Sequence, residues 1–236
     1  MAPPIAYTTA NVTLGFPNVK AVTANVVTSA KATLRSNNMT GGSGASGSIN
    51  PPGWGGGICP IHHNRGHLIG NNLGGPGNVA NNLVTLVAGT NHPIMYDYEY
   101  MVRDFVLNNS GREPFEYLVE CTYGTTDYTL TPGFTVPGAA GNPFCLFPAP
   151  AVLLLSLKDT NGTSITINNL VGGSWNQQRL SQFYTHMMVG EKLKVLNGVF
   201  KEYSGHTHYT NNCWSVTHDA TVLATGATNY ATGLGY

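Results

Sequence analysis

The sequence is poor in charge. Asp, Glu, Lys and Arg make up 9% of the 236 residues and give a formal net charge of zero, whereas roughly a quarter of the residues in ordinary soluble proteins are charged. A neutral chain excludes an overall electrostatic field that would attract nucleic acid. The charges are nevertheless unevenly placed. The first 60 residues include Lys20, Lys31 and Arg35 but no Asp or Glu, which leaves room for a local basic face.

Long apolar runs are also missing. A membrane-spanning helix needs roughly 18 or more apolar residues, and the most apolar stretch, residues 149–157, is too short. Residues 1–7 lack the basic and apolar regions of a signal peptide. We therefore expect no membrane association. The Asn-, Thr-, Ser- and Gly-rich composition favours a protein that is secreted or delivered into a target cell, by another route or after loss of a leader.

Paired cysteines are absent. Cys59, Cys121, Cys145 and Cys213 are widely separated and form no C-x-x-C motif, which excludes a zinc ribbon and a thioredoxin-like redox site. A chain of this length buries a large core without a disulfide or a structural metal. Disulfides and buried free thiols both remain open.

The first half of the chain shows a pattern of short strands and turns. β-prone runs predict strands within residues 5–35, and the Gly- and Ser-rich residues 40–57 predict a loop that acts as a hinge or as a flap beside a substrate. Two further short strands are expected at 66–69 and 82–87, separated by the Gly-Gly-Pro-Gly turn at 74–77.

Pro93 sets the start of the first predicted helix, because proline is tolerated only in the first turn. We expect this helix at residues 91–107, with an apolar stripe formed by Met95, Tyr98, Val102, Phe105 and Val106. The later pattern predicts a second helix at 177–190 and strands at 115–123, 128–136, 152–158 and 164–170. The last two strands would form a hairpin, since Asn161-Gly162 between them favours a tight turn.

Residues 64–103 contain the side chains that phosphodiester hydrolysis requires. The reaction needs a base to activate water, a cation to neutralise charge on the phosphorane, and stabilisation of the leaving oxygen. His67 is the candidate base, because an imidazole with an ordinary pKa of about 6.5 accepts a proton at neutral pH. Asn91 offers a neutral oxygen to a hard cation such as magnesium.

Glu99 and two arginines complete this group. Glu99 lies eight positions after Asn91, so the two share a broad helix face and the carboxylate is placed to hydrogen-bond the waters of a cation. Arg103 lies four positions after Glu99 and would pair with it or contact a phosphate. Arg65 lies two positions before His67, which puts both side chains on one face of a strand.

These motifs resemble the DNA/RNA non-specific endonuclease family, whose ββα-metal (His-Me finger) core carries the motif Asp-Arg-Gly-His. The matching residues are Asn-Arg-Gly-His-Leu-Ile-Gly at 64–70, Leu-Gly-Gly at 73–75, Asn-Asn-Leu-Val at 81–84 and Asn91-x-x-x-Met95-x-x-x-Glu99-x-x-x-Arg103. The resemblance is close over these residues and loose over the strands from 115 to 170. It implies an α+β fold with a ββα-metal core embedded in a mainly antiparallel β-sheet.

The resemblance also implies a role for each polar residue. His67 would be the general base, and Asn91 would be the protein ligand of a single Mg²⁺, with Mn²⁺ as the alternative metal. The other members of the site would be Asn82 as a supporting residue, Glu99 orienting a metal-bound water, and Arg65 and Arg103 on the phosphate side.

The chain departs from the family pattern at Asn64, where aspartate is usual. Loss of that charge affects metal affinity or loop geometry more than the identity of the base. Some members carry a further arginine on the substrate side, for which Arg35 is the candidate. By the same resemblance residues 1–57 would be part of the nuclease domain, 58–170 would form its core, and 171–236 would be a C-terminal extension without an assigned role.

The implied function is metal-dependent, sequence-non-specific hydrolysis of DNA, with RNA as a possible second substrate. Most contacts would go to backbone phosphates, so binding should weaken as the salt concentration rises. A secreted or delivered antibacterial toxin would need an immunity or inhibitor protein as a second partner. The competing interpretation is a catalytically inactive nucleic-acid-binding or surface β-rich module.

The site residues also have purely structural interpretations. Asn91 is a candidate N-cap of the predicted helix, and a capping amide would not also bind a metal. Glu99 and Arg103 have the spacing of an ordinary exposed i,i+4 pair. Arg65 is a candidate brace for its own loop.

Two histidine-rich segments raise the alternative of a structural metal protein. Cys59-Pro60-Ile61-His62-His63 resembles a soft-metal cluster, but its spacing matches no common zinc module, so a loop leading into the active strand is the preferred interpretation. A second group would combine His206, His208 and His218 with Cys213.

Overall fold

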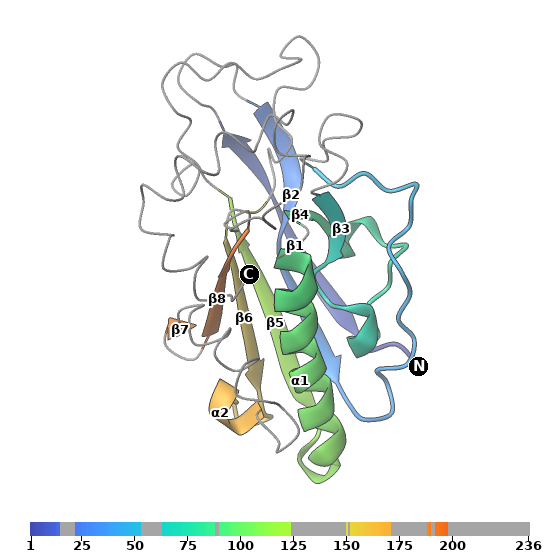
Figure 1. The fold of residues 1–236 in the computed structure, drawn as a ribbon, viewed down its shortest axis with the longest axis vertical. Coiled ribbons are helices and arrows are strands. Elements are labelled where there is room, and N and C mark those ends of the chain that lie inside the picture. Colours follow the sequence, from blue (N-terminus) through green and yellow to red (C-terminus); the bar gives the residue numbers. More distant parts are fainter. Residues whose placement is uncertain are drawn as a thin grey trace, which may run out of the picture.

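The computed structural model describes residues 1–14, 22–52, 63–87, 90–123, 150, 152–170, 188–189 and 192–197. In these ranges one antiparallel sheet has the strand order β1-β2-β5-β6-β8-β7 (Figure 1). Its strands are β1 (Ile5–Leu14), β2 (Val22–Leu34), β5 (Phe115–Thr122), β6 (Val152–Lys158), β7 (Met188–Val189) and β8 (Lys192–Leu196). A separate antiparallel hairpin pairs β3 (His63–His67) with β4 (Leu83–Val87).

Short helical elements connect the strands. The two α-helices of the described ranges are α1 (Tyr96–Asn108) and α2 (Ile167–Leu170). Single helical turns are η1 (Asn71–Leu73), η2 (Ala80–Asn82), η3 (Thr90–Met95) and η4 (Ser110–Arg112). None of the helices in this part of the protein has the length and apolar character needed to cross a membrane.

Side-chain alternation explains how the sheet forms. Along β5, Phe115, Tyr117, Val119 and Cys121 are buried, and the residues between them are more exposed. A period of two places one side of the strand in the core and the other toward solvent. The strands predicted at 115–123 and 152–158 are confirmed as β5 and β6. Those predicted within 5–35 are confirmed as β1 and β2.

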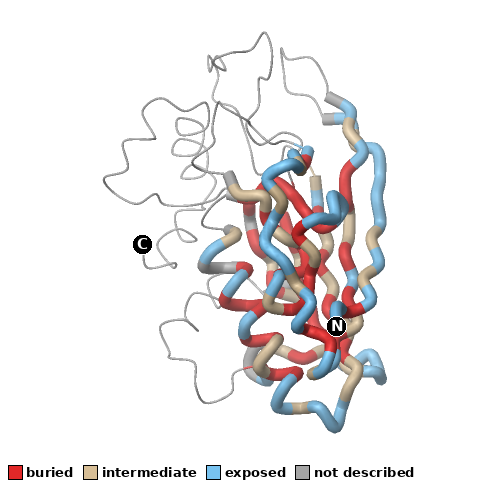
Figure 2. The backbone as a smooth tube through the Cα atoms, turned by 90° about the vertical axis from the view of Figure 1, so that its right-hand side faces the viewer, coloured by how far each residue is buried: buried red, intermediate tan, exposed pale blue. Residues whose placement is uncertain are grey.

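Helix α1 covers one face of the sheet (Figures 1 and 2). The predicted apolar stripe is buried as expected, and it packs against β5: the rings of Phe105 and Phe115 meet edge to face at 5.5 Å. The rings of Tyr98 and Tyr117 lie 6.4 Å apart. The main core is therefore the layer between α1 and the sheet.

The hairpin β3–β4 leads directly into η3 and α1, which gives the strand–strand–helix order of the predicted ββα unit. Turn η3 contacts both strands of the hairpin, and η1, in the loop between these strands, contacts α1. The described residues thus form an α+β fold in which a ββα unit lies beside a mainly antiparallel sheet, as predicted.

The boundaries of this unit differ from the prediction. Strand β3 covers 63–67 rather than 66–69, and the regular helix begins at Tyr96 rather than at Asn91. The reason is local: His92 has φ −145° and ψ 123°, because the residue before a proline disfavours the helical conformation. The chain therefore breaks at His92 and becomes regular only one turn later.

The prediction of a strand at 164–170 is wrong, although the tight turn before it is present. Gly162 has φ 78°, and its N–H donates to the carbonyl of Asp159 at 3.0 Å. Helix α2 replaces most of the expected strand. Its start is capped, because the backbone N–H and the hydroxyl of Thr166 both donate to Oδ1 of Asn169, at 3.2 and 2.8 Å. The bond from the backbone N–H of Thr166 to the Asn169 side chain is one half of a capping box, a contact that begins helices.

The predicted helix at 177–190 is wrong at its end, where Met188 and Val189 form strand β7. The rest of that range and the strand predicted at 128–136 lie outside the described residues. Cys121 is a buried free thiol whose pKa burial raises to about 12. The other cysteines and the side chains of the histidine-rich segments also lie outside the described residues: Cys59, Cys145, Cys213, His62, His63, His206, His208 and His218.

Part of the segment assigned to a C-terminal extension is built into the sheet. Strand β8 pairs with β6. The buried amide of Asn197 donates to the carbonyl of Thr85 at 3.1 Å and to that of Pro150 at 2.8 Å. These bonds connect the end of β8 to the hairpin strand β4.

Candidate active site

His67 ends strand β3 and is partly buried. Its Nε2 lies 2.9 Å from the backbone carbonyl oxygen of Ser43. Because a carbonyl oxygen only accepts, Nε2 must carry the proton, and Nδ1 keeps the lone pair that accepts a proton from water. Burial lowers the pKa of His67 below its ordinary value, although the contact with Ser43 opposes this. The arrangement favours a neutral imidazole at neutral pH.

The loop that carries Ser43 is packed tightly against the turn after His67. The N–H of Ser43 donates to Gly75 at 3.2 Å, and its hydroxyl accepts from the N–H of Gly77 at 2.8 Å. A Cβ atom added to Gly42 would lie 1.9 Å from the carbonyl oxygen of Asn71. The described part of the Gly-rich segment is thus an element that fixes the imidazole.

Arg65 holds the same loop further along. Its Nε donates to the carbonyl of Ile49, and its Nη2 donates to Oδ1 of Asn50 at 2.9 Å. The structural interpretation of Arg65 as a brace therefore applies. A contact between this guanidinium and a phosphate stays a prediction.

Asn82 is completely buried and clamps the turn that follows His67. Its Oδ1 accepts from the N–H of Ile69 at 3.0 Å. Its Nδ2 donates to the carbonyls of Ile69 at 3.0 Å and Pro76 at 3.1 Å. Both amide hydrogens are used in this way, so Asn82 shapes the site by holding backbone.

Glu99 projects from α1 and is only 5% exposed. Its Oε1 accepts from the N–H of Gly70 at 2.9 Å, and a Cβ atom on Gly70 would lie 1.9 Å from its Oε2. Burial raises the pKa of Glu99 to about 8, against the opposing effect of the Gly70 bond. A divalent cation nearby would favour the ionised form.

The interpretation of Glu99 and Arg103 as an exposed ion pair is wrong. Glu99 is buried, and no salt bridge joins the two in the part of the chain that the structure describes. Arg103 is partly exposed, with its guanidinium 5.9 Å from the centre of the Tyr100 ring. A contact between Arg103 and a phosphate stays a prediction.

Asn91 lies in η3, is partly exposed, and makes no side-chain hydrogen bond to another described residue. The N-cap position of α1 is Met95, four residues after Asn91. The capping interpretation of Asn91 is therefore wrong, and its amide oxygen is available to a ligand.

The structure brings part of the predicted site together through backbone contacts. His67 is the first residue of the segment 67–77. Asn82 holds this segment through its bonds to Ile69 and Pro76, and Glu99 holds it by accepting from the N–H of Gly70. Arg35 lies exposed at the end of β2.

Sequence reasoning missed Ser43, whose carbonyl contacts the imidazole, and it assigned no role to Gly70. The close approach of Glu99 to Gly70 is the reason that the motif ends in glycine. The contact of Ser43 leaves no such signal in the sequence, because every residue has a backbone carbonyl.

Comparison with known families identifies the segment that carries these residues. Residues 22–136 match the family model for DNA/RNA non-specific endonuclease. This segment belongs to that family. The resemblance of residues 64–103 is thereby confirmed, and the protein is a nuclease whose substrate is nucleic acid. Enzymes of the family depend on a metal.

Solved nucleases show only distant similarity. NucA from Streptococcus agalactiae with magnesium bound is 19% identical over 67% of this chain and 68% of its own, with a TM-score of 0.37. Sda1 nuclease with bound zinc is 14% identical over 68% of this chain and 80% of its own, also with a TM-score of 0.37. These values are too low to define the fold or the metal. No curated protein matches the chain.

The donor atoms of the nuclease site fit a hard cation that keeps its waters. No group of three or more His, Cys, Asp or Glu residues gathers anywhere in the described ranges, so a fully protein-coordinated soft metal has no support there. Asn91 offers one amide oxygen, and Glu99 leaves Oε2 without a hydrogen bond to a described residue. Magnesium prefers such oxygen ligands and often retains several waters.

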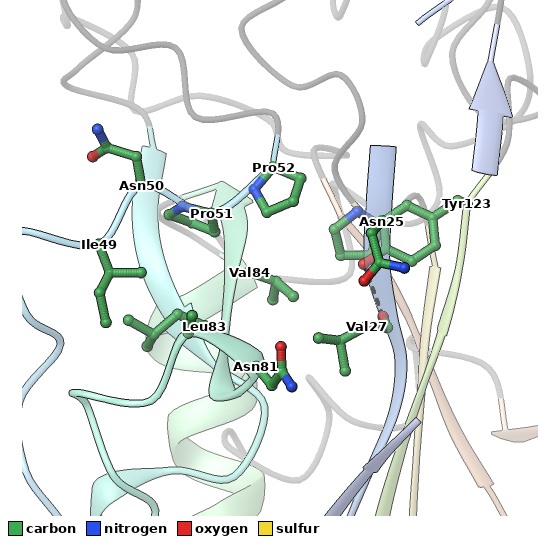
Figure 3. Close-up of a pocket in the computed structure, with 12 residues that line it drawn as sticks. Asn25, Val27, Ile49, Asn50, Pro51, Pro52, Asn81, Leu83, Val84 and Tyr123 are labelled. Atoms are coloured by element: carbon green, nitrogen blue, oxygen red, sulfur yellow. Dashed lines mark hydrogen bonds between the residues drawn. The ribbon is translucent and has the colours of Figure 1, made fainter. Parts of the chain in front are cut away.

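A cavity of about 150 Å³ lies beside the loop that Arg65 braces (Figure 3). It separates this loop, at residues 49–52, from strand β2, and Val27 and Leu83 form part of its apolar wall. Tyr123 closes one side and donates from its hydroxyl to the carbonyl of Val27 at 2.9 Å. The cavity thus lies between the ββα unit and the main sheet.

Proposed function

We propose that the protein is a metal-dependent, sequence-non-specific endonuclease of DNA and RNA in which His67 is the general base. The contact that supports this most is the bond from Nε2 of His67 to the carbonyl of Ser43. It leaves Nδ1 as the basic atom, and the lowered pKa of His67 keeps that atom unprotonated at neutral pH.

In this mechanism Nδ1 of His67 takes a proton from a water molecule as the water oxygen attacks the phosphorus in line. The new O–P bond forms while the bond to the 3′ oxygen breaks, so the products carry a 5′ phosphate and a 3′ hydroxyl. Asn91 would hold the divalent metal, which would supply electrostatic stabilisation of the phosphorane and of the leaving oxygen. Glu99 would orient a water of the metal through Oε2.

The remaining polar residues serve the substrate backbone. Arg103 is partly exposed and would contact a phosphate oxygen. Arg65 would do the same beside the loop that it braces. Asn82 would act indirectly, by holding the turn that follows His67 and includes Gly70, the residue that contacts Glu99. Mg²⁺ is the proposed metal, with Mn²⁺ as its replacement, because both accept oxygen ligands.

Composition is the support for the proposed biological setting. Few charges and an Asn-, Thr- and Gly-rich surface favour a protein that is secreted or delivered as an antibacterial toxin. Such a toxin requires an immunity protein in the producing cell. Expression of the active chain in a bacterial cytoplasm should stop growth, and expression of the neighbouring reading frame should restore it. Normal growth with soluble active enzyme would remove the toxin proposal and leave the nuclease proposal intact.

The test of the enzymatic proposal uses supercoiled plasmid and single-stranded RNA as substrates. Purified protein with Mg²⁺ should nick and then degrade the plasmid, and excess EDTA should stop it. Cleavage of a covalently closed circle identifies an endonuclease, because an exonuclease finds no end. Full activity in EDTA would overturn the metal dependence. A protein that binds DNA but leaves both substrates intact would instead be the inactive module.

A further inference from the structure

The surroundings of Glu99 contain more polar atoms than its proposed role explains. Both amide atoms of Asn72 are buried and have no hydrogen-bond partner in the described part of the chain. The hydroxyl of Tyr117 is buried and equally without a partner there. Among the described residues, only Gly70 bonds to the Glu99 carboxylate, through Oε1. Buried polar groups in native proteins nearly always have a partner, and an exception points to a bound water or ion.

The Asn72 amide and the Glu99 carboxylate lie against the same residue, Gly70. A Cβ atom placed on Gly70 would be 1.9 Å from Oε2 of Glu99 and 2.7 Å from Oδ1 of Asn72. The two oxygens are therefore neighbours on one side of Gly70. Tyr117 lies on β5 below, close enough for the charge of Glu99 to add to the burial that raises the pKa of this tyrosine.

Two acceptor oxygens need a donor between them. The structure shows no direct hydrogen bond between the Asn72 amide and Oε2 of Glu99, whereas a water molecule between them can donate one hydrogen to each oxygen. A buried water typically makes about three hydrogen bonds to such groups. Leaving these buried polar groups without partners would destabilise the folded state.

We propose that a water molecule is bound between Asn72 and Oε2 of Glu99, and that Asn72 is thereby a positioning residue for the Glu99 carboxylate. Asn72 touches neither metal nor substrate. It fixes the direction in which the carboxylate presents its free lone pairs to the waters of the metal, so this inference rests on the proposed role of Glu99. Partners of this kind typically change metal affinity about 10–100-fold when they are removed.

A crystal structure of the parent protein with Mn²⁺ tests the bound water without any substitution. An ordered water within hydrogen-bond distance of both the Asn72 amide and Oε2 of Glu99 is the expected result. A direct contact between the two side chains, or a gap filled by apolar atoms, would overturn the proposal.

The positioning role is tested by matched substitutions, Asn72→Leu and Asn71→Leu. Both residues lie in η1, but Asn71 is exposed. Calorimetric titration with Mn²⁺, in the absence of nucleic acid, should show affinity lowered about 10-fold in Asn72→Leu and unchanged in Asn71→Leu. Equal affinity in the two variants would refute the role of Asn72. If Asn72→Leu does not fold, Asn72→Ala replaces it in the same comparison, with the same expected loss.

The two proposals fail in different ways. Parent protein that binds Mn²⁺ but cleaves nothing, with the affinity loss confined to the Asn72 variants, removes the enzymatic proposal and supports the positioning of Glu99. Plasmid cleavage that depends on Mg²⁺, with Mn²⁺ affinity unaffected by Asn72→Leu, removes the positioning proposal alone.

Discussion

The main sheet and the ββα unit bury different kinds of side chain. Along β5 the buried residues are aromatic and aliphatic apart from one thiol, and they pack against α1. Four of the seven buried polar residues in the described ranges fall instead within residues 82–99: Asn82, Thr85, Asp97 and Glu99. Burying a polar group costs free energy unless it is hydrogen-bonded. The comparison separates a region that stabilises the fold from a region that shapes a site.

The polar groups of the ββα unit bond mainly to backbone. Asn82 clamps the turn after His67, and Glu99 supports Gly70. Thr85 donates to the carbonyl of Pro52 at 2.9 Å, at the end of the loop that carries Ser43. These bonds fix two loops. One contacts His67 through the carbonyl of Ser43, and the other contacts Glu99 through the N–H of Gly70. Substitutions in this unit should therefore lower the activity of the folded molecules, whereas substitutions in the sheet should lower stability and leave that activity unchanged.

The largest expected effect is that of His67→Ala. Loss of a general base typically lowers the rate about 10²–10⁴-fold. Plasmid cleavage at saturating Mg²⁺ should fall within this range while the melting temperature stays near that of the parent. Cleavage at the parental rate would show that another group accepts the proton.

Gly70→Ala should have the second largest effect and lower the cleavage rate about 10²-fold. A displacement of about 1 Å in a group that positions the reactants costs about that much. The added Cβ would overlap Oε2 of Glu99. Gly47→Ala is the matched control, because nothing lies within 4 Å of a Cβ atom at that position. Similar activities of the two variants, measured on the same plasmid, would show that the position of Glu99 does not affect cleavage.

Asn82→Leu compares the two regions directly with Val119→Ala in β5. Removing three hydrogen bonds at about 1 kcal/mol each should lower the free energy of unfolding of Asn82→Leu by about 3 kcal/mol, and activity per folded molecule should fall too. Val119→Ala should lose a similar free energy through the cavity that it leaves, but keep its activity. Urea unfolding and plasmid cleavage measure both quantities. Full activity in Asn82→Leu would show that the buried polar residues of the ββα unit do not shape the site.

The smallest effect is expected from Lys31→Ala. Its ammonium lies 3.2 Å from Glu116, but both side chains are nearly half exposed, at 49% and 44%. Exposed pairs contribute about 0–1 kcal/mol. Urea unfolding should show a loss below about 1 kcal/mol and no change in activity. A larger loss would mean that exposed ion pairs on the sheet contribute substantially to the free energy of unfolding.

The sequence predicted the elements whose signals are local. The apolar stripe of α1 and the alternation of β5 were enough to locate both. Asn161-Gly162 gave the turn but not what followed it, because the capping contact of Thr166 with Asn169 outweighed the β-prone residues there. The helix starts later than predicted, because Pro93 holds His92 in an extended conformation.

The candidate site was predictable in its residue types but not in its contacts. The motif and spacings led to His67, Asn91 and Glu99 through the family resemblance. Three features depend on the fold: the carbonyl of Ser43 on the imidazole, the close approach of Glu99 to Gly70, and the bracing role of Arg65. Each joins residues distant in sequence, so no local pattern reports it.

The pH dependence of the cleavage rate tests whether His67 is the general base. The base form of His67 is lost as the pH falls through its pKa, which burial holds below the ordinary value of about 6.5. At saturating Mg²⁺ and plasmid, the rate should fall through one ionisation centred below about pH 6.5, and the residual activity of His67→Ala should lack this step. A midpoint above neutrality, or the same step in His67→Ala, would contradict His67 as the base.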